Sequence, residues 1–151
     1  KTESITIKIP PGIEDLKKIR LTGQGDPSAN GGPAGDLMIR VKVAAHPLYR
    51  RQGNNLLLKV PITLAEAALG AKIDLPTPNG TLTISVPSGS SSGKKLRLKG
   101  QGVELVRGNP GDLIVELQIA LPNSYDEGIK KTIETLQQQF AQDDLRADLN
   151  W

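Results

Sequence analysis

The nonapeptide KKIRLTGQG (17–25) decides the fold, because it is repeated almost unchanged as KKLRLKGQG (94–102). The two copies differ only where Ile19 corresponds to Leu96 and Thr22 to Lys99. Internal repeats of this kind mark a duplicated structural unit. The sequence around each copy therefore has to show what was duplicated, a site or a scaffold.

The repeat extends in both directions from the nonapeptide. Upstream, SITIKIPPG (4–12) corresponds to TLTISVPSG (81–89), and downstream GDLMIRVKV (35–43) corresponds to GDLIVELQI (111–119). Apolar and polar residues alternate in these segments, which predicts strands with one buried face. Each copy thus predicts a strand, a Pro-Gly turn, a strand, a Gly-rich loop and a strand. We expect a β-meander-like unit, present twice.

A further segment, residues 54–80, precedes the second copy only. It predicts a strand at 55–60, then a short helix in which Thr63 and Glu66 form a capping box and Gly70 is the stop. A strand around 72–75 and a Pro-Asn-Gly turn follow. The first copy has no such segment in front of it, so we expect a fragment that begins within its first subdomain. A genuinely abbreviated first subdomain is the alternative.

The predicted organisation is two β-subdomains in tandem, followed by a helix. The expected boundaries are 1–48 for the C-terminal part of the first β-subdomain, 49–122 for the second, 123–142 for the C-terminal helix and 143–151 for a polar tail.

The C-terminal helix is predicted to be amphipathic. Ser124 and Glu127 fit a capping box after Pro122. The apolar stripe that follows consists of Ile129, Ile133, Leu136 and Phe140. The pattern alone favours packing on the chain's own second sheet. A dimer interface is the alternative, because a completed repeat leaves less core to cover.

The composition disfavours several classes of function. Cysteine is absent, which excludes disulfides and thiolate metal sites in these residues. The net charge is only +3 with 3% aromatics, and the cations are scattered, so nucleic-acid binding is not expected. No apolar run approaches the ~20 residues of a membrane span.

No catalytic constellation is evident either. The single histidine, His46, precedes Pro47 and is predicted to be structural. Asp36 and Asp112 occupy equivalent positions and are predicted to cap turns, not to form a catalytic pair. The GQG glycines match no phosphate-binding fingerprint. The sequence therefore predicts no enzyme, no cofactor and no metal site.

Taken together, these segments resemble the C-terminal substrate-binding region of DnaJ-type co-chaperones. The most specific parts are HP-x-[YF]-x-R-x-G-x-x-L, here His46 to Leu56, and L-x-E-A-x-L-G-x-x-[IV], here Leu64 to Ile73. The resemblance implies a mostly β chain with two tandem β-sandwich or barrel-like subdomains, short helices and a C-terminal amphipathic dimerisation helix. That helix would make a homodimer through Ile129, Ile133, Leu136 and Phe140.

The resemblance also implies a function. Such a region binds unfolded or extended hydrophobic clients by β-augmentation along an edge strand of the first subdomain. It then transfers them to a DnaK-type 70-kDa heat-shock chaperone through a J-domain, which this sequence lacks. A cytoplasmic protein without nucleic-acid or membrane partners is expected.

The client groove is the last expectation. The positions that match its apolar pocket are Ile5 and Ile39, although the pattern alone would assign both to an ordinary core. The alternative is a dimerising structural module without a competent groove. Because the nonapeptide occurs in both subdomains and the groove in one, we interpret the nonapeptide as scaffold.

Overall fold

The computed structural model describes residues 2–28, 31–139 and 145–149. The fold is mostly β, as the sequence predicts: the described residues form eight strands and two short helices. The chain divides into two compact units, Lys1–Ile119 and Ala120–Trp151, and each is described by itself.

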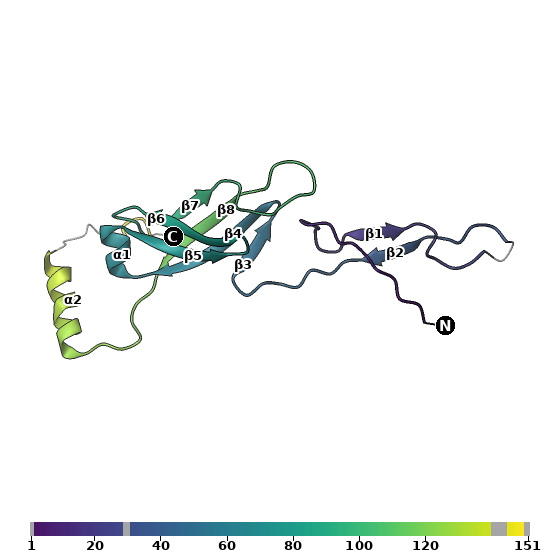
Figure 1. The fold of residues 1–151 in the computed structure, drawn as a ribbon. Coiled ribbons are helices and arrows are strands. Elements are labelled where there is room, and N and C mark those ends of the chain that lie inside the picture. The colour runs from purple at the N-terminus through teal and green to yellow at the C-terminus, as the bar shows by residue number, and fades with distance from the viewer. Residues whose placement is uncertain (1, 29–30, 140–144, 150–151) are drawn as a thin grey trace. The chain divides into compact units, whose positions relative to one another are not determined.

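Most of the first unit is a two-layer sandwich (Figure 1). One layer is a four-stranded sheet in the order β3-β4-β8-β7, and the other is the antiparallel hairpin β5–β6. In the first layer β4 and β8 run parallel, while the outer pairs are antiparallel. The strands are β3 (Tyr49–Gln52), β4 (Asn55–Ile62), β5 (Ala71–Thr77), β6 (Gly80–Val86), β7 (Lys95–Leu98) and β8 (Leu113–Ile119).

The core lies between these two layers. Alternate residues of β4 and β8 point into it, and Leu113, Val115 and Leu117 are at most 1% exposed. The β5–β6 hairpin covers them from the other layer. The core residues of the strands are Leu58, Val60 and Ile62 of β4, Leu113, Val115 and Leu117 of β8, and Leu75, Ile84 and Val86 of β5 and β6. This arrangement is a sandwich, as predicted for the second copy of the repeat.

The short helix α1 (Leu64–Leu69) follows β4 as predicted. Thr63 Oγ1 accepts a hydrogen bond from the Glu66 amide at 3.1 Å, and Glu66 Oε1 accepts one from the Thr63 amide at 2.9 Å. This reciprocal pair is a capping box. The helix ends at Gly70, whose φ of +81° suits glycine.

The first copy of the repeat forms a separate two-stranded ribbon. Its strands β1 (Lys18–Leu21) and β2 (Leu37–Arg40) are antiparallel, with Ile19 opposite Ile39 and Leu21 opposite Leu37. The ribbon is the counterpart of β7 and β8 in the second copy.

Two expectations about the repeat are wrong. Its strands do not form a meander, because β6 pairs with β5 and not with β7. In addition, residues 4–12 form no strand. The corresponding β6 is a strand because β5 supplies its hydrogen-bond partners, and no described strand does the same for residues 4–12.

The second unit contains the helix α2 (Glu127–Gln139). The capping box predicted from Ser124 is wrong, because the first helical hydrogen bond runs from the Lys130 amide to the Asp126 carbonyl at 3.0 Å. Asp126 is the cap, and its Oδ1 accepts from the Ile129 amide at 2.8 Å. A box on Ser124 would start the helix two residues earlier. Phe140 lies outside the described residues.

Candidate functional site

The repeated nonapeptide performs the same structural task in both copies. In the first, Arg20 Nε donates to Asp36 Oδ2 at 2.5 Å, and the Gly23 amide donates to Asp36 Oδ1 at 3.1 Å. In the second, Arg97 Nη1 donates to Asp112 at 2.6 Å and the Gly100 amide donates at 3.1 Å. Each aspartate therefore ties a strand to the glycine turn that ends it.

The electrostatics of the second copy follow from these contacts. The Gly100 amide and then the Arg97 guanidinium hold the pKa of the Asp112 carboxyl below its ordinary value. Both donors favour the ionised carboxylate. Asp36 and Asp112 thus cap turns, as predicted, and the nonapeptide is scaffold.

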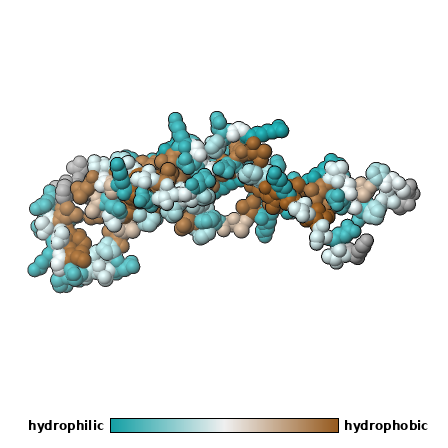
Figure 2. Space-filling model, in the orientation of Figure 1, coloured by the Kyte–Doolittle hydropathy of each residue, from teal (hydrophilic) through white to brown (hydrophobic). Residues whose placement is uncertain are grey.

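The scaffold presents a different surface in each copy. In the ribbon one face carries four apolar side chains that are only half-buried: Ile19, Leu21, Leu37 and Ile39. Their counterparts in the second copy are Leu96, Leu98, Leu113 and Val115, which belong to the core or pack against it under β5 and β6. No second sheet covers the ribbon within the described residues. Figure 2 shows brown, apolar atoms at the surface of this part of the chain.

The edges of the two copies differ in the same way. Strand β8 is paired on both sides, with β7 and with β4. Its counterpart β2 is paired only with β1 in the described part of the chain, so its other edge is open. The strand on the equivalent edge of β8 is the Leu-rich segment NLLLKVPI. This edge of the motif is therefore able to pair with an extended, apolar strand.

The two predicted pocket residues have different positions. Ile39 lies in the middle of β2, on the half-buried apolar face. Ile5 lies outside any strand and is 42% exposed, and no backbone hydrogen bond among the described residues ties 2–10 to the ribbon. The structure does not bring the two into one sheet. Ile19, Leu21 and Leu37 lie on the same face as Ile39. They were not named as pocket residues from the sequence, although the alternation of apolar and polar residues indicated this face.

The single histidine has a structural position. His46 Nδ1 accepts from the amides of Leu48 at 3.1 Å and Tyr49 at 3.3 Å, and its ring meets the Tyr49 ring edge-on at 5.3 Å. These contacts shape the turn into β3. His46 also lines a cavity of about 720 Å³, beside which Arg51 donates to the Ile13 carbonyl at 2.8 Å. Within the described residues no three His, Asp or Glu side chains gather as a metal site would require.

Three residues of the predicted dimerisation stripe are described, and all lie on α2. Ile129, Ile133 and Leu136 are 39%, 44% and 38% exposed. No residue of α2 is buried.

The comparison with known families agrees with this geometry. Among the described residues, no helix has the length and apolarity to cross a membrane. The family model described as the DnaJ C terminal domain matches residues 1–122, most of the chain. The duplicated sheet motif, the capped helix α1 and this match lead to one conclusion: the chain belongs to the DnaJ C-terminal domain family.

Proposed function

We propose that this DnaJ-type co-chaperone module binds extended, apolar segments of unfolded client proteins by adding them as a strand to β2. One observation carries the proposal: among the described residues, β2 has an open edge and an uncovered apolar face, whereas its counterpart β8 is covered by β4, β5 and β6. Adding a strand to an open sheet edge is a common way to recognise peptides with little dependence on their sequence.

The backbone of β2 offers the hydrogen bonds for such a strand. Both backbone groups of Val41 point toward β1: its amide donates to the Lys17 carbonyl, and its carbonyl accepts from the Leu16 amide. Because orientation alternates along a strand, the groups of Ile39 and Leu37 point the same way. Those of Met38 and Arg40 then point to the open edge.

The apolar face provides the preference for apolar clients. A client strand on the β2 edge extends the surface formed by Leu37 and Ile39, and its alternate side chains would bury apolar area there. Leu56 and Leu58 of β4 do this beside Leu113 and Val115 in the second copy. We propose that Ile5, which is exposed on the segment before the ribbon, contributes to the same groove.

The test is a titration of a fluorescent Leu-rich heptapeptide into the whole natural polypeptide that contains these residues. Ile39→Asp should weaken binding at least about tenfold, because a charge buried in an apolar contact is costly. Met38→Asp is the matched control, since Met38 is adjacent but exposed on the other face. Its effect should stay within about twofold, as is usual for an exposed position. Equal effects of the two substitutions would rule out the groove.

Two further parts complete the proposed function. The α2 stripe of Ile129, Ile133 and Leu136, extended by Phe140, joins two copies into a homodimer. Bound clients pass to a DnaK-type 70-kDa chaperone in the cytoplasm. The exposure of the three described residues supports the dimer, and membership of the DnaJ family supports the chaperone partner. If neither the wild-type chain nor its variants bind the peptide, a dimerising structural module is the better assignment.

A further inference from the structure

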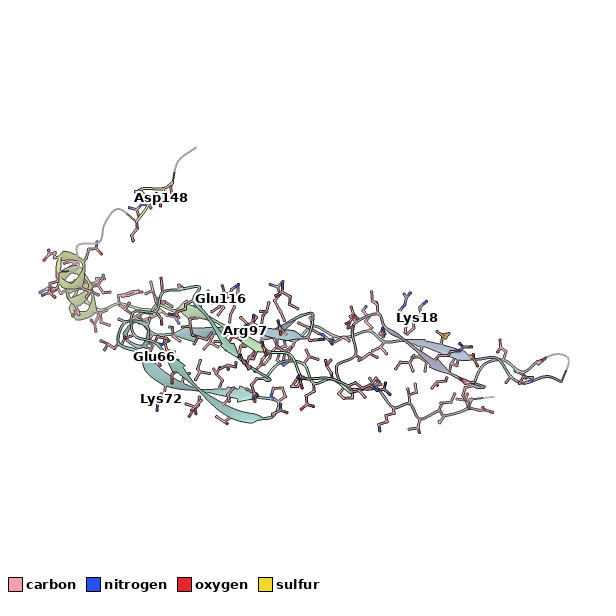
Figure 3. All side chains as sticks on the ribbon, turned by 90° about the horizontal axis from the view of Figure 1, so that it is seen from above. Lys18, Glu66, Lys72, Arg97, Glu116 and Asp148 are labelled. Carbon is pink, nitrogen blue, oxygen red and sulfur yellow. The ribbon has the colours of Figure 1, made fainter. Side chains whose placement is uncertain are left out.

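The outer face of the four-stranded sheet carries a pattern that the client site does not use. The register places Arg50, Leu57 and Ile114 in one row across β3, β4 and β8. The next row contains Lys59, Glu116 and Lys95 on β4, β8 and β7. Residues in register share a face, so both rows lie on the side of the sheet away from the core. Figure 3 labels Glu116 and Arg97 on this sheet.

Three cations of this face, Arg50, Lys59 and Lys95, have no carboxylate partner in the described part of the chain, whereas Arg97 on β7 pairs with Asp112. Ion pairs among the described residues join Arg20 with Asp36, Arg97 with Asp112 and Lys130 with Glu127. Arg50, Lys59 and Lys95 take part in none of them. Glu116 lies between Lys59 and Lys95 but pairs with neither. Three unpaired cations around one acid leave this face with an excess of positive charge.

The same face is hollowed and partly apolar. A groove of about 290 Å³ is lined by Leu48, Leu57 and Ile114 together with the cations Arg50, Lys59 and Lys95 and the acid Glu116. Leu48 is 62% exposed, and Leu57 and Ile114 are half-buried. The outer face of a sandwich normally alternates to polar residues. Apolar side chains at the centre of a basic rim are the arrangement of a binding surface rather than of a purely solvated one.

From this geometry we infer that the outer face of β3, β4, β8 and β7 binds an acidic peptide segment that also carries leucine-like side chains. Carboxylates complement Arg50, Lys59 and Lys95, while one or two aliphatic side chains fill the groove over Leu57 and Ile114. A groove of this volume is at the small end for ligand sites, which suits side chains of a peptide and not a cofactor. A nucleic acid is the poorer fit, because no Phe, Tyr or Trp lines the groove and His46 supplies the one aromatic ring among its lining residues, whereas single-stranded nucleic acids are bound on several stacking rings.

The probe is a fluorescein-labelled octapeptide of alternating Asp and Leu, titrated into the intact protein at low salt and followed by anisotropy. Lys59→Glu combined with Lys95→Glu should weaken its binding about tenfold or more, because both rim charges are reversed. Leu57→Ser should weaken it as well. The matched control, Lys18→Glu with Lys72→Glu, makes the same change in net charge on β1 and β5. In Figure 3, Lys72 lies on the other side of the sandwich from Glu116.

The controls separate this site from simple charge attraction and from the client groove. The control double variant should bind within about threefold of wild type, as expected for distant exposed charges. Because the probe could also enter the client groove, the rim variants are compared in the Ile39→Asp background, where Lys59→Glu with Lys95→Glu should still weaken binding about tenfold whether or not the client groove exists. The inference is overturned if the octapeptide does not bind, if Asp–Ser or Lys–Leu octapeptides bind equally well, or if the control variant loses as much affinity. Displacement by equimolar oligothymidylate would instead identify a nucleic-acid surface.

Discussion

At the scale of single residues, one glycine shows how the two copies of the repeat differ. Gly35 and Gly111 hold the same position in front of β2 and β8. A Cβ on Gly111 would lie 1.7 Å from the carbonyl oxygen of Asn54, because the β3–β4 hairpin packs there. A Cβ on Gly35 would meet only the Asp26 oxygen, at an ordinary 3.8 Å. Glycine is therefore required at position 111, where a side chain would clash with the backbone, but not at position 35.

Substitution by alanine measures this difference. Gly111→Ala should lower the free energy of unfolding by about 3 kcal/mol or more, or prevent folding, because neither backbone can yield easily. Gly35→Ala should change it by less than about 0.5 kcal/mol. Urea unfolding followed by circular dichroism checks both. Equal losses would show that a strand also packs beside β2.

A second residue-scale prediction concerns the pKa of Asp112. The Gly100 amide and the Arg97 guanidinium lower it, so the carboxyl resonance should titrate below the ordinary aspartate value of about 3.9. In Arg97→Gln the midpoint should rise only in part, since the Gly100 hydrogen bond is the larger cause. Carbon-detected NMR of the carboxyl group measures both midpoints.

The lowered pKa fixes the direction of the pH effect on stability. A carboxyl with a folded pKa below its unfolded value binds fewer protons in the folded chain, so it stabilises above the unfolded pKa. That contribution is lost as the pH falls through the folded pKa. Asp112→Asn should therefore cost more stability at pH 7 than at pH 2. A loss that does not change with pH would contradict the charge-assisted contact.

At the scale of elements, the cap of α1 is a local device whose effect can be isolated. Thr63→Ala removes the acceptor for the Glu66 amide and should destabilise the sandwich by about 1 kcal/mol. Thr81→Ala on β6 is the control, because Thr81 is exposed and its side chain makes no hydrogen bond with another described residue. Thermal unfolding compares the two. Equal shifts in Tm would mean that the threonine side chain, and not the cap, is responsible.

Elements with local signals are the ones that the sequence predicted well. The α1 cap and stop follow from Thr63, Glu66 and Gly70, which contact only near neighbours. Strand pairing was predicted poorly, because a period of two specifies the buried face but not the partner strand. Hence the parallel β4–β8 pair and the β5–β6 layer were not foreseen. Ser124 failed as a cap because Asp126, two residues later, is an equally good cap residue.

For the candidate site, too, the sequence predicted which residues share an apolar face but not which segments form strands. Alternation placed Ile39 on an apolar face, and the structure agrees. Alternation in residues 4–12 was equally regular, yet Ile5 lies outside any strand. A strand exists only where a second strand supplies hydrogen bonds, and sequence periodicity contains no information about that supply. The basic outer face also needed the register of four strands before it could be recognised.

At the scale of the whole molecule, one sheet motif occurs in two environments that differ in what covers it. In the second copy the motif is enclosed by β4, β5 and β6, and its apolar residues form the core. In the first copy, no strand of the described chain covers the outer edge of β2, and the apolar face is only half-buried. A chaperone needs both a stable body and an unsatisfied surface. Under the proposed client site, unequal covering of the duplicated motif leaves one copy available for binding and makes the other copy part of the core.

The final prediction concerns assembly of two such molecules through α2. Ile133 is 44% exposed at the centre of the stripe, so a helix from a second copy would bury it. Ile133→Asp would place two like charges in that contact, and the dimer dissociation constant should rise at least about 30-fold. Gln138→Asp, on the opposite face of α2, adds the same charge and should leave the dimer intact. Sedimentation equilibrium at micromolar concentration distinguishes the two variants, and an unchanged mass for Ile133→Asp would remove the stripe from the interface.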